Sequence, residues 1–172
     1  MPEKGWAMNK EERFVSIINE YEATILSICR IYTNGKKEKM RDLFQDVLIN
    51  IWKSIDTFEG KSSINTWLYR IALNTAISHL RKREKQIQIV DITEEFNRFS
   101  DENKPDERLE TLYEAIEKLN DIDKSIIFLY LDKKNHKEIA EILGISVSNV
   151  GTRIQRIKVK LKNIIKNSNY DK

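Results

Sequence analysis

The residues best suited to binding chemistry lie near the C-terminus, on the polar side of a regular apolar pattern. Val147, Val150 and Ile154 begin a series that steps by three and four residues to Ile164, which predicts a long amphipathic helix. Short polar side chains at its start can hydrogen-bond base edges, and the cations that follow can pair with phosphates. We therefore expect duplex DNA to be bound by Ser148, Asn149, Thr152, Arg153, Arg156, Lys158 and Lys160.

A shorter helix comes before this one. Asn135 and Glu138 fit a capping box, in which each side chain accepts a hydrogen bond from the other residue's backbone N–H. Gly144 supplies a turn, and Ser146 can cap the following helix. Together these positions predict a helix-turn-helix over residues 135–166. An ordinary helical hairpin with a basic outer face is the alternative interpretation.

Gly151 fits neither interpretation well. Inside a helix, glycine costs about 1 kcal/mol relative to alanine. It therefore either permits close approach of DNA or of a neighbouring helix, or has no role.

A second candidate binding segment lies in the N-terminal half. Residues 60–83 contain five Lys or Arg and no Asp or Glu, and residues 144–166 contain six and none. A solvated helix face is the ordinary explanation of a charge run, but two acid-free blocks on separate helices favour polyanion binding. The first block includes a helix expected from Ile64 to Arg83, which Ser62 or Ser63 can cap. The expected core side of this helix contains Ile64, Leu68, Ile71, Ala72, Thr75 and Ala76.

Two further helices are expected before residue 60. Apolar residues recur at helical spacing over residues 14–32 and over residues 40–55. Trp52 falls within the second stripe and is expected in the core, as is Cys29 in the first, whose thiol has no second cysteine to pair with.

The connector differs from both basic blocks. From Glu84 to Arg108 the sequence has eight acids against four bases and sparse apolar residues, which indicates a flexible linker. Pro105 and Asp106 can start another helix, and Asp121 can cap one more. With only five Gly and two Pro, the sequence predicts an all-α fold of two small helical domains joined by this flexible acidic linker.

Catalysis is not expected. The sequence has no Cys/His metal spacing and no Gly-rich phosphate loop, and neither His79 nor His136 has a nucleophile or paired carboxylate at an evident spacing. We therefore predict no enzyme activity, cofactor or metal. The sequence also has no apolar run long enough to cross a membrane and no apolar signal-peptide core, so we expect a cytoplasmic protein without membrane insertion.

Two stretches of the chain together resemble one family. DLFQDVLINIWKSIDTFEGKSSINTWLYRIALNTAISHLRKRE is similar to region two of bacterial extracytoplasmic-function (ECF) sigma factors, and KEIAEILGISVSNVGTRIQRIKVKLK is similar to their region four. The resemblance implies region two at residues 10–84, the acidic linker at 85–105 and region four at 106–168. It also implies a transcription initiation factor that binds RNA polymerase core, through the clamp helices of β′ and the flap of β, and directs it to promoter DNA. An anti-sigma factor is a further partner that the family allows.

The resemblance also implies roles for individual residues. Polymerase core would be bound by Asp42, Gln45, Asp46 and Asn50. The minus-ten element and its melted strand would be held by Phe58, Lys61, Ser62, Asn65, Trp67, Tyr69, Arg70, Asn74, Arg81 and Lys82, a mixture of stacking surfaces and cations that suits single-stranded bases. For Trp67, a core position is an equally good interpretation. The face of residues 148–160 described above would bind the minus-thirty-five element.

This chain departs from the family at the recognition helix. Where the family commonly has Gly-Thr-Val, this chain has Ser148-Asn149-Val150, and Gly151 replaces a basic or polar residue. The resemblance therefore supports the fold of this region more strongly than it supports individual base contacts. A one-component repressor is the alternative function, and it predicts a ligand pocket or dimer helix in the N-terminal half.

Overall fold

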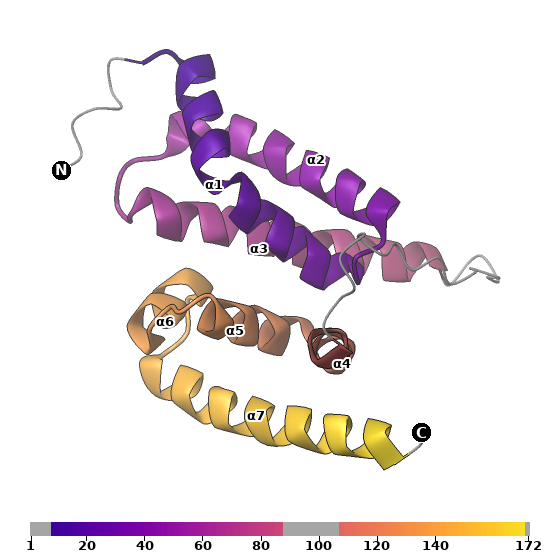
Figure 1. Ribbon diagram of the computed structural model, residues 1–172. Coiled ribbons are helices and arrows are strands. Elements are labelled where there is room, and N and C mark those ends of the chain that lie inside the picture. The colour runs from indigo at the N-terminus through magenta and orange to yellow at the C-terminus, as the bar shows by residue number, and fades with distance from the viewer. Residues whose placement is uncertain (1–7, 88–106, 171–172) are drawn as a thin grey trace.

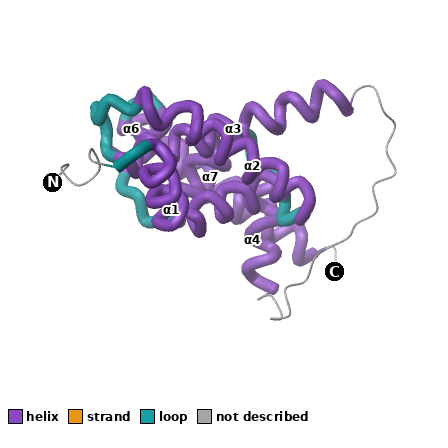
Figure 2. Tube along the Cα trace, turned by 90° about the horizontal axis from the view of Figure 1, so that it is seen from above, coloured by secondary structure: helices purple, strands orange, loops and turns teal. Residues whose placement is uncertain are grey.

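The computed structural model describes the backbone of residues 8–87 and 107–170. The described residues form helices and contain no strand (Figures 1 and 2), as the sequence predicted. Most of the predicted acidic linker lies outside them. The elements are α1 (Lys10–Thr33), α2 (Lys37–Ser54), a 3-10 turn (Ile55–Thr57), α3 (Ile64–Ile87), α4 (Glu107–Glu117), α5 (Asp121–Leu131), α6 (His136–Leu143) and α7 (Val147–Tyr170).

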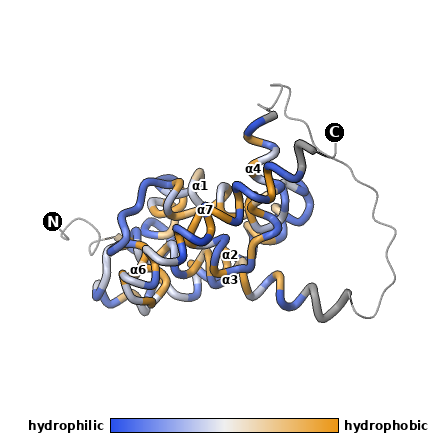
Figure 3. The backbone as a smooth tube through the Cα atoms, turned by 90° about the horizontal axis from the view of Figure 1, so that it is seen from below, coloured by the Kyte–Doolittle hydropathy of each residue, from blue (hydrophilic) through white to orange (hydrophobic). Residues whose placement is uncertain are grey.

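Helices α1 to α3 form one group around a shared apolar core. Each helix has an apolar side, so polar and apolar stretches alternate along it (Figure 3). Ile25 of α1, Leu43 and Val47 of α2 and Leu68 of α3 are fully buried. Burial of such side chains contributes about 1.5–3 kcal/mol each, which explains why the three stripes pack together.

Helices α4 to α7 form the second group. Ile116 of α4, Ile126 of α5, Ile139 of α6 and Ile154 of α7 are all buried. The stripe on α7 runs past the other three helices, so one long helix forms a floor under them (Figure 1).

The two groups pack directly against each other. Helix α6 contacts α3, and α4 and α5 contact α1. Figure 1 shows α5 and α6 lying between α3 and α7. Tyr69 and Tyr32 are only 2% and 3% exposed, because both lie at this junction.

The structure corrects the expectation that Trp52 is a core residue. Its side chain is 36% exposed, and Phe14 packs edge-on against it at 5.3 Å between ring centroids. The ammonium of Lys10 lies 4.6 Å from the indole centroid. Trp52 keeps the spacing of the apolar stripe, but it packs on the N-terminal end of α1, where its ring keeps part of its surface open.

Two boundaries also differ from the sequence expectation. Asn120, not Asp121, caps α5, because its side chain accepts a hydrogen bond from the Asp123 N–H at 2.9 Å. Helix α3 continues past Arg83 to Ile87, and its C-terminal end extends beyond the packed helices (Figures 1 and 2). Tyr69 and Leu73, outside the predicted core stripe of α3, are buried as well, because α3 is covered on more than one side.

Candidate nucleic-acid interface

The helix-turn-helix has the local geometry that the sequence predicted. The Asn135 side chain accepts hydrogen bonds from Lys137 N at 2.9 Å and Glu138 N at 3.0 Å, and Glu138 accepts one from Asn135 N at 2.7 Å. Gly144 ends α6 with a φ of 67°, in the left-handed region that glycine tolerates. Ser146 Oγ accepts from Asn149 N at 3.2 Å and so caps α7. The capping box, the turn and the second cap are therefore confirmed.

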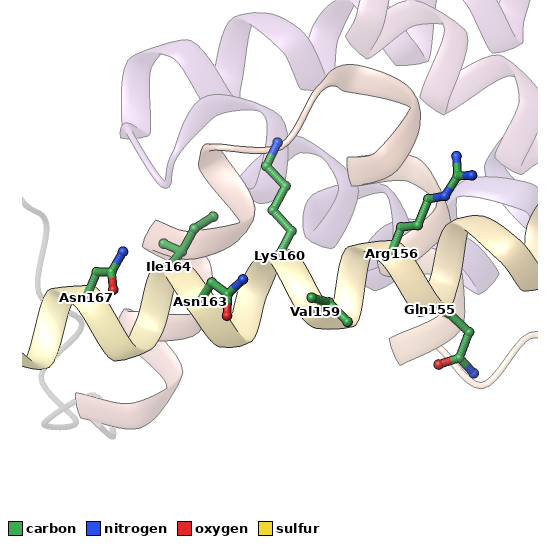
Figure 4. Close-up of a pocket in the computed structure, with 7 residues that line it drawn as sticks. All are labelled: Gln155, Arg156, Val159, Lys160, Asn163, Ile164 and Asn167. Atoms are coloured by element: carbon green, nitrogen blue, oxygen red, sulfur yellow. The ribbon is translucent and has the colours of Figure 1, made fainter.

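The outer face of α7 carries the predicted duplex-binding side chains. Exposed positions in this set are Ser148, Asn149, Thr152, Arg156, Lys158 and Lys160. Arg156, Val159 and Lys160 lie along one side of α7 that is open to solvent (Figure 4). Val159 is 61% exposed at this site.

Arg153 is held more tightly than its neighbours. Its Nη1 lies 2.7 Å from Asp123 Oδ1 on α5, and its Nε donates to Asn149 Oδ1 at 3.2 Å. The Asp123 carboxylate therefore holds the Arg153 guanidinium beside the recognition face. Two of the guanidinium nitrogens already donate hydrogen bonds, one to Asp123 and one to Asn149. Sequence reasoning missed Asp123 because it lies thirty residues away, and nothing in the local pattern signals the pairing.

Lys158 is also positioned by a neighbour on α5. Its ammonium donates to the Tyr130 hydroxyl at 2.8 Å and lies 4.4 Å from that ring's centroid. Arg156 and Lys160 therefore have the more adaptable cations, suited to phosphates.

Gly151 has no structural requirement for being glycine. A Cβ added there would lie 3.8 Å from the His136 ring, which is ordinary van der Waals contact. The sequence left open that a neighbouring helix approaches Gly151 too closely for a side chain. The structure shows no such close approach.

The predicted minus-ten residues separate into three places. Phe58, Lys61, Ser62, Asn65 and Trp67 gather where the loop after α2 enters α3. The rings of Phe58 and Trp67 lie 5.1 Å apart, and Trp67 is half-buried. This end of α3 therefore has two half-buried aromatic rings and the exposed Lys61, a combination that can stack on unpaired bases and pair with their phosphates.

Tyr69 and Arg70 point elsewhere. Tyr69 is buried against α5 and its following turn, and the Arg70 guanidinium hydrogen-bonds α6. Asn74, Arg81 and Lys82 are exposed farther along α3. The first five predicted residues thus lie at one end of α3, whereas Tyr69 is buried and the half-buried Arg70 is engaged by α6.

The predicted polymerase-binding residues lie on one side of α2. Asp42, Gln45 and Asp46 are exposed, and Asn50 is half-buried with its amide donating to Thr75 Oγ1 at 2.9 Å. Asp46 also lies 2.9 Å from His79 Nδ1 on α3. The Asp46 carboxylate therefore has a described partner on α3.

Two other features bear on what the site holds. Within residues 8–87 and 107–170 no cluster of three His, Cys, Asp or Glu side chains is arranged to bind a metal. Among the same residues, no helix is both long and apolar enough to span a membrane.

A two-part helical protein with a helix-turn-helix and a second basic, aromatic face has the architecture of a DNA-binding transcription factor. The sigma-70 region 2 family model matches residues 17–86, and the sigma-70 region 4 model matches residues 109–161. The chain is 35% identical over 133 residues to the RNA polymerase sigma factor YlaC of Bacillus subtilis, covering 73% of this chain and 76% of that protein. It is 31% identical to the ECF RNA polymerase sigma factor SigW of the same organism, covering 88% of each.

Solved structures agree on the fold. The sigma factor RpoE, in complex with the anti-sigma factor NepR from Bartonella quintana, matches with a TM-score of 0.74 at 23% identity, over 89% of this chain and 96% of that one. CnrH, in complex with the cytosolic domain of CnrY, matches with a TM-score of 0.65 at 21% identity, over 91% and 90%. The chain belongs to the ECF group of the sigma-70 family: it is a transcription initiation factor that binds RNA polymerase core and directs it to promoters.

Proposed function

We propose that α7 binds the minus-thirty-five element as duplex, and that the aromatic end of α3 holds the opened minus-ten strand. The main support is the exposed polar and basic face of α7, the second helix of a helix-turn-helix whose two helices are capped by Asn135 and Ser146. Ser148, Asn149 and Thr152 lie at the start of that helix, where a recognition helix reaches base edges, and the exposed cations Arg156 and Lys160 follow farther along it, where phosphates would be bound. Residues 10–84, 85–105 and 106–168 remain the proposed bounds of region two, linker and region four.

The second part of the proposal concerns α3 and its loop. Phe58 and Trp67 offer stacking surfaces for unpaired bases, each of which contributes about 1–3 kcal/mol on an aromatic side chain. Lys61 lies at the same end, where its only described ion pair is with the exposed Glu59. A strand separated from its complement can stack on both rings and pair its phosphates with Lys61, whereas duplex DNA, with its bases stacked inside, can use only the cation.

The third part places polymerase core on α2. Asp42, Gln45 and Asp46 form an acidic and polar exposed row, which lies on a different helix from the DNA-binding residues. Core binding and promoter recognition should therefore be separable by mutation.

The test is run-off transcription from a promoter library with purified protein and core polymerase. Arg156→Ala should weaken promoter selection and leave core binding intact, whereas Asp46→Ala should weaken core binding. Arg156 is the better probe than Arg153, because Arg153 also forms the ion pair with Asp123. The matched control is Glu110→Ala, an exposed residue of α4 outside both faces.

Identical defects in the two variants would contradict the separate roles of α2 and α7. If transcription does not depend on the added protein, and the protein alone binds promoter DNA tightly, the result would favour a repressor instead.

A further inference from the structure

Two of the proposed polymerase-binding residues of α2 are held by side chains of α3. His79 Nδ1 lies 2.9 Å from Asp46 Oδ2, and the Asn50 amide nitrogen lies 2.9 Å from Thr75 Oγ1. On each helix the two residues are four positions, or about one turn, apart, and the helices run antiparallel (Figure 1). The two pairs are therefore neighbours along one α2–α3 contact.

The first pair holds a carboxylate at the surface. The Asp46 side chain is 51% exposed and that of His79 only 16%, so the packed imidazole holds the open carboxylate. An ionised carboxylate can only accept, so His79 Nδ1 donates this hydrogen bond. The imidazole contacts Oδ2, and Oδ1 is left to accept from a partner. His79 thus limits the conformations of Asp46 without using all of its acceptor capacity.

The second pair fixes the orientation of an amide. Thr75 is buried, and its hydroxyl donates to the Ile71 carbonyl at 2.7 Å. Because a hydroxyl has one hydrogen to donate, Thr75 Oγ1 can only accept from Asn50. The NH2 group of Asn50 must therefore be turned toward α3. Its carbonyl oxygen is left to accept from a partner.

Both pairs leave the same kind of group to polymerase. Asp42, Asp46 and Asn50 follow one another at four-residue steps and so share one side of α2. This side has two carboxylates and, from Asn50, a carbonyl oxygen. Such a row of acceptors suits a partner that supplies cations or N–H donors. Side chains that are already held lose less conformational freedom when that partner binds.

We propose that His79 and Thr75 are positioning residues for polymerase binding, which hold the acceptor groups of Asp46 and Asn50 in the orientation that core polymerase binds. The inference rests on the proposed role of α2 in core binding. His79 and Thr75 act through their partners on α2 and need no contact with polymerase. Their effect on core affinity therefore disappears when those partners are removed.

Substitutions at both positions separate positioning from packing. His79→Ala removes the imidazole, whereas His79→Asn keeps a nitrogen donor at the same number of bonds from the backbone as Nδ1. Thr75→Val keeps the branched shape and removes the acceptor, whereas Thr75→Ser keeps the hydroxyl. The matched control is Ser78→Ala, at the exposed position next to His79.

Core affinity is measured on the full chain. Fluorescence anisotropy of the protein, with a dye on its N-terminal amine, follows titration with core polymerase. His79→Ala and Thr75→Val should each weaken binding by about threefold, the effect of one hydrogen bond on a side chain that stays in contact with water. The conservative variants and Ser78→Ala should bind like the unaltered protein. His79→Ala should cause no further loss in an Asp46→Ala background, nor Thr75→Val in an Asn50→Ala background.

Thermal unfolding, followed by circular dichroism, separates a loss of positioning from a loss of fold. Alanine forms helices better than histidine, so His79→Ala should keep or raise the thermal midpoint while it weakens core binding. A loss of affinity that is equally large without the Asp46 carboxylate would show that His79 has only a structural role, and would overturn its assignment.

The positioning role is also overturned if His79→Ala and Thr75→Val bind core polymerase as well as the unaltered protein, while Asp46→Ala binds weakly. The proposed function of α2 then stands. Tighter binding by His79→Ala would show that the imidazole competes with polymerase for the carboxylate, which is the opposite of positioning. If Asp46→Ala and Asn50→Ala leave core affinity unchanged, the proposed role of α2 fails, and the positioning role fails with it.

Discussion

Helices α3 and α7 have the same length of 24 residues and the same kind of basic sequence, but the fold treats them differently. Helix α7 lies at the edge of its group and leaves one face open along its length, whereas α3 is covered by α1 and α2 on one side and by α6 on another. Arg156 of α7 is exposed, while Arg70 of α3 is tied to the end of α6. A basic block without Asp or Glu, such as residues 60–83 or 144–166, therefore indicates a polyanion site, and the packing decides whether that site is open.

The largest expected effect tests whether the two groups behave as one folding unit. Leu68→Ala in α3 and Ile154→Ala in α7 each remove a buried side chain and should lower the free energy of unfolding by about 2–5 kcal/mol. Because the groups share a packed junction, both variants should shift the same transition in guanidinium, followed by far-ultraviolet circular dichroism. Two transitions, each moved by only one variant, would show that the groups unfold separately.

A smaller effect is expected from the ion pair that fixes Arg153. Asp123→Asn keeps an oxygen to accept hydrogen bonds but removes the charge opposite the guanidinium, so stability should fall by about 1 kcal/mol. Promoter selection in the run-off assay should also relax, since Arg153 is no longer held beside the recognition face. Asp132→Asn is the control, as an acid on the same helix group without contact to Arg153. Unchanged promoter selection would show that the position of Arg153 is unimportant for DNA.

Gly151→Ala should have an effect of opposite sign. The added methyl group meets only the His136 ring at ordinary distance, so the thermal midpoint should rise by about 2–4 °C, in line with about 1 kcal/mol of helix propensity. Weaker promoter binding by this more stable variant would identify Gly151 as a point of close DNA approach. A lower midpoint would contradict the space seen around it.

The smallest expected effect concerns the thiol of Cys29, which is buried in α1. Burial raises the pKa of Cys29 to about 12, so the folded state favours the protonated thiol. The resulting stabilisation is complete below the ordinary thiol pKa of 9.0 and is lost as the pH rises toward 12, because the unfolded thiol ionises first. Iodoacetamide at pH 8 should label the native protein far more slowly than the urea-unfolded protein. Equal rates would mean that the core of α1 to α3 opens readily.

Much of the local structure followed from the sequence. The capping box of Asn135 and Glu138, the turn at Gly144 and the cap at Ser146 depend on neighbouring residues alone, and each is present as predicted. The apolar periodicity of α1, α2 and α7 placed most of the core for the same reason. Asn120 and Asp121 are both good caps at adjacent positions, and the sequence pattern did not separate them.

Only the tertiary structure decided which side chains of these helices remain open. Trp52 keeps the spacing of a core residue and is exposed, whereas Tyr69 breaks the core stripe of α3 and is buried. The difference comes from contacts across the junction, such as those of Tyr69 with Asp132 and of Arg70 with Glu141, which join residues more than sixty positions apart. Periodicity describes one helix at a time, so it determined that two basic helices would form and could not determine that one of them would be covered by the other half of the protein.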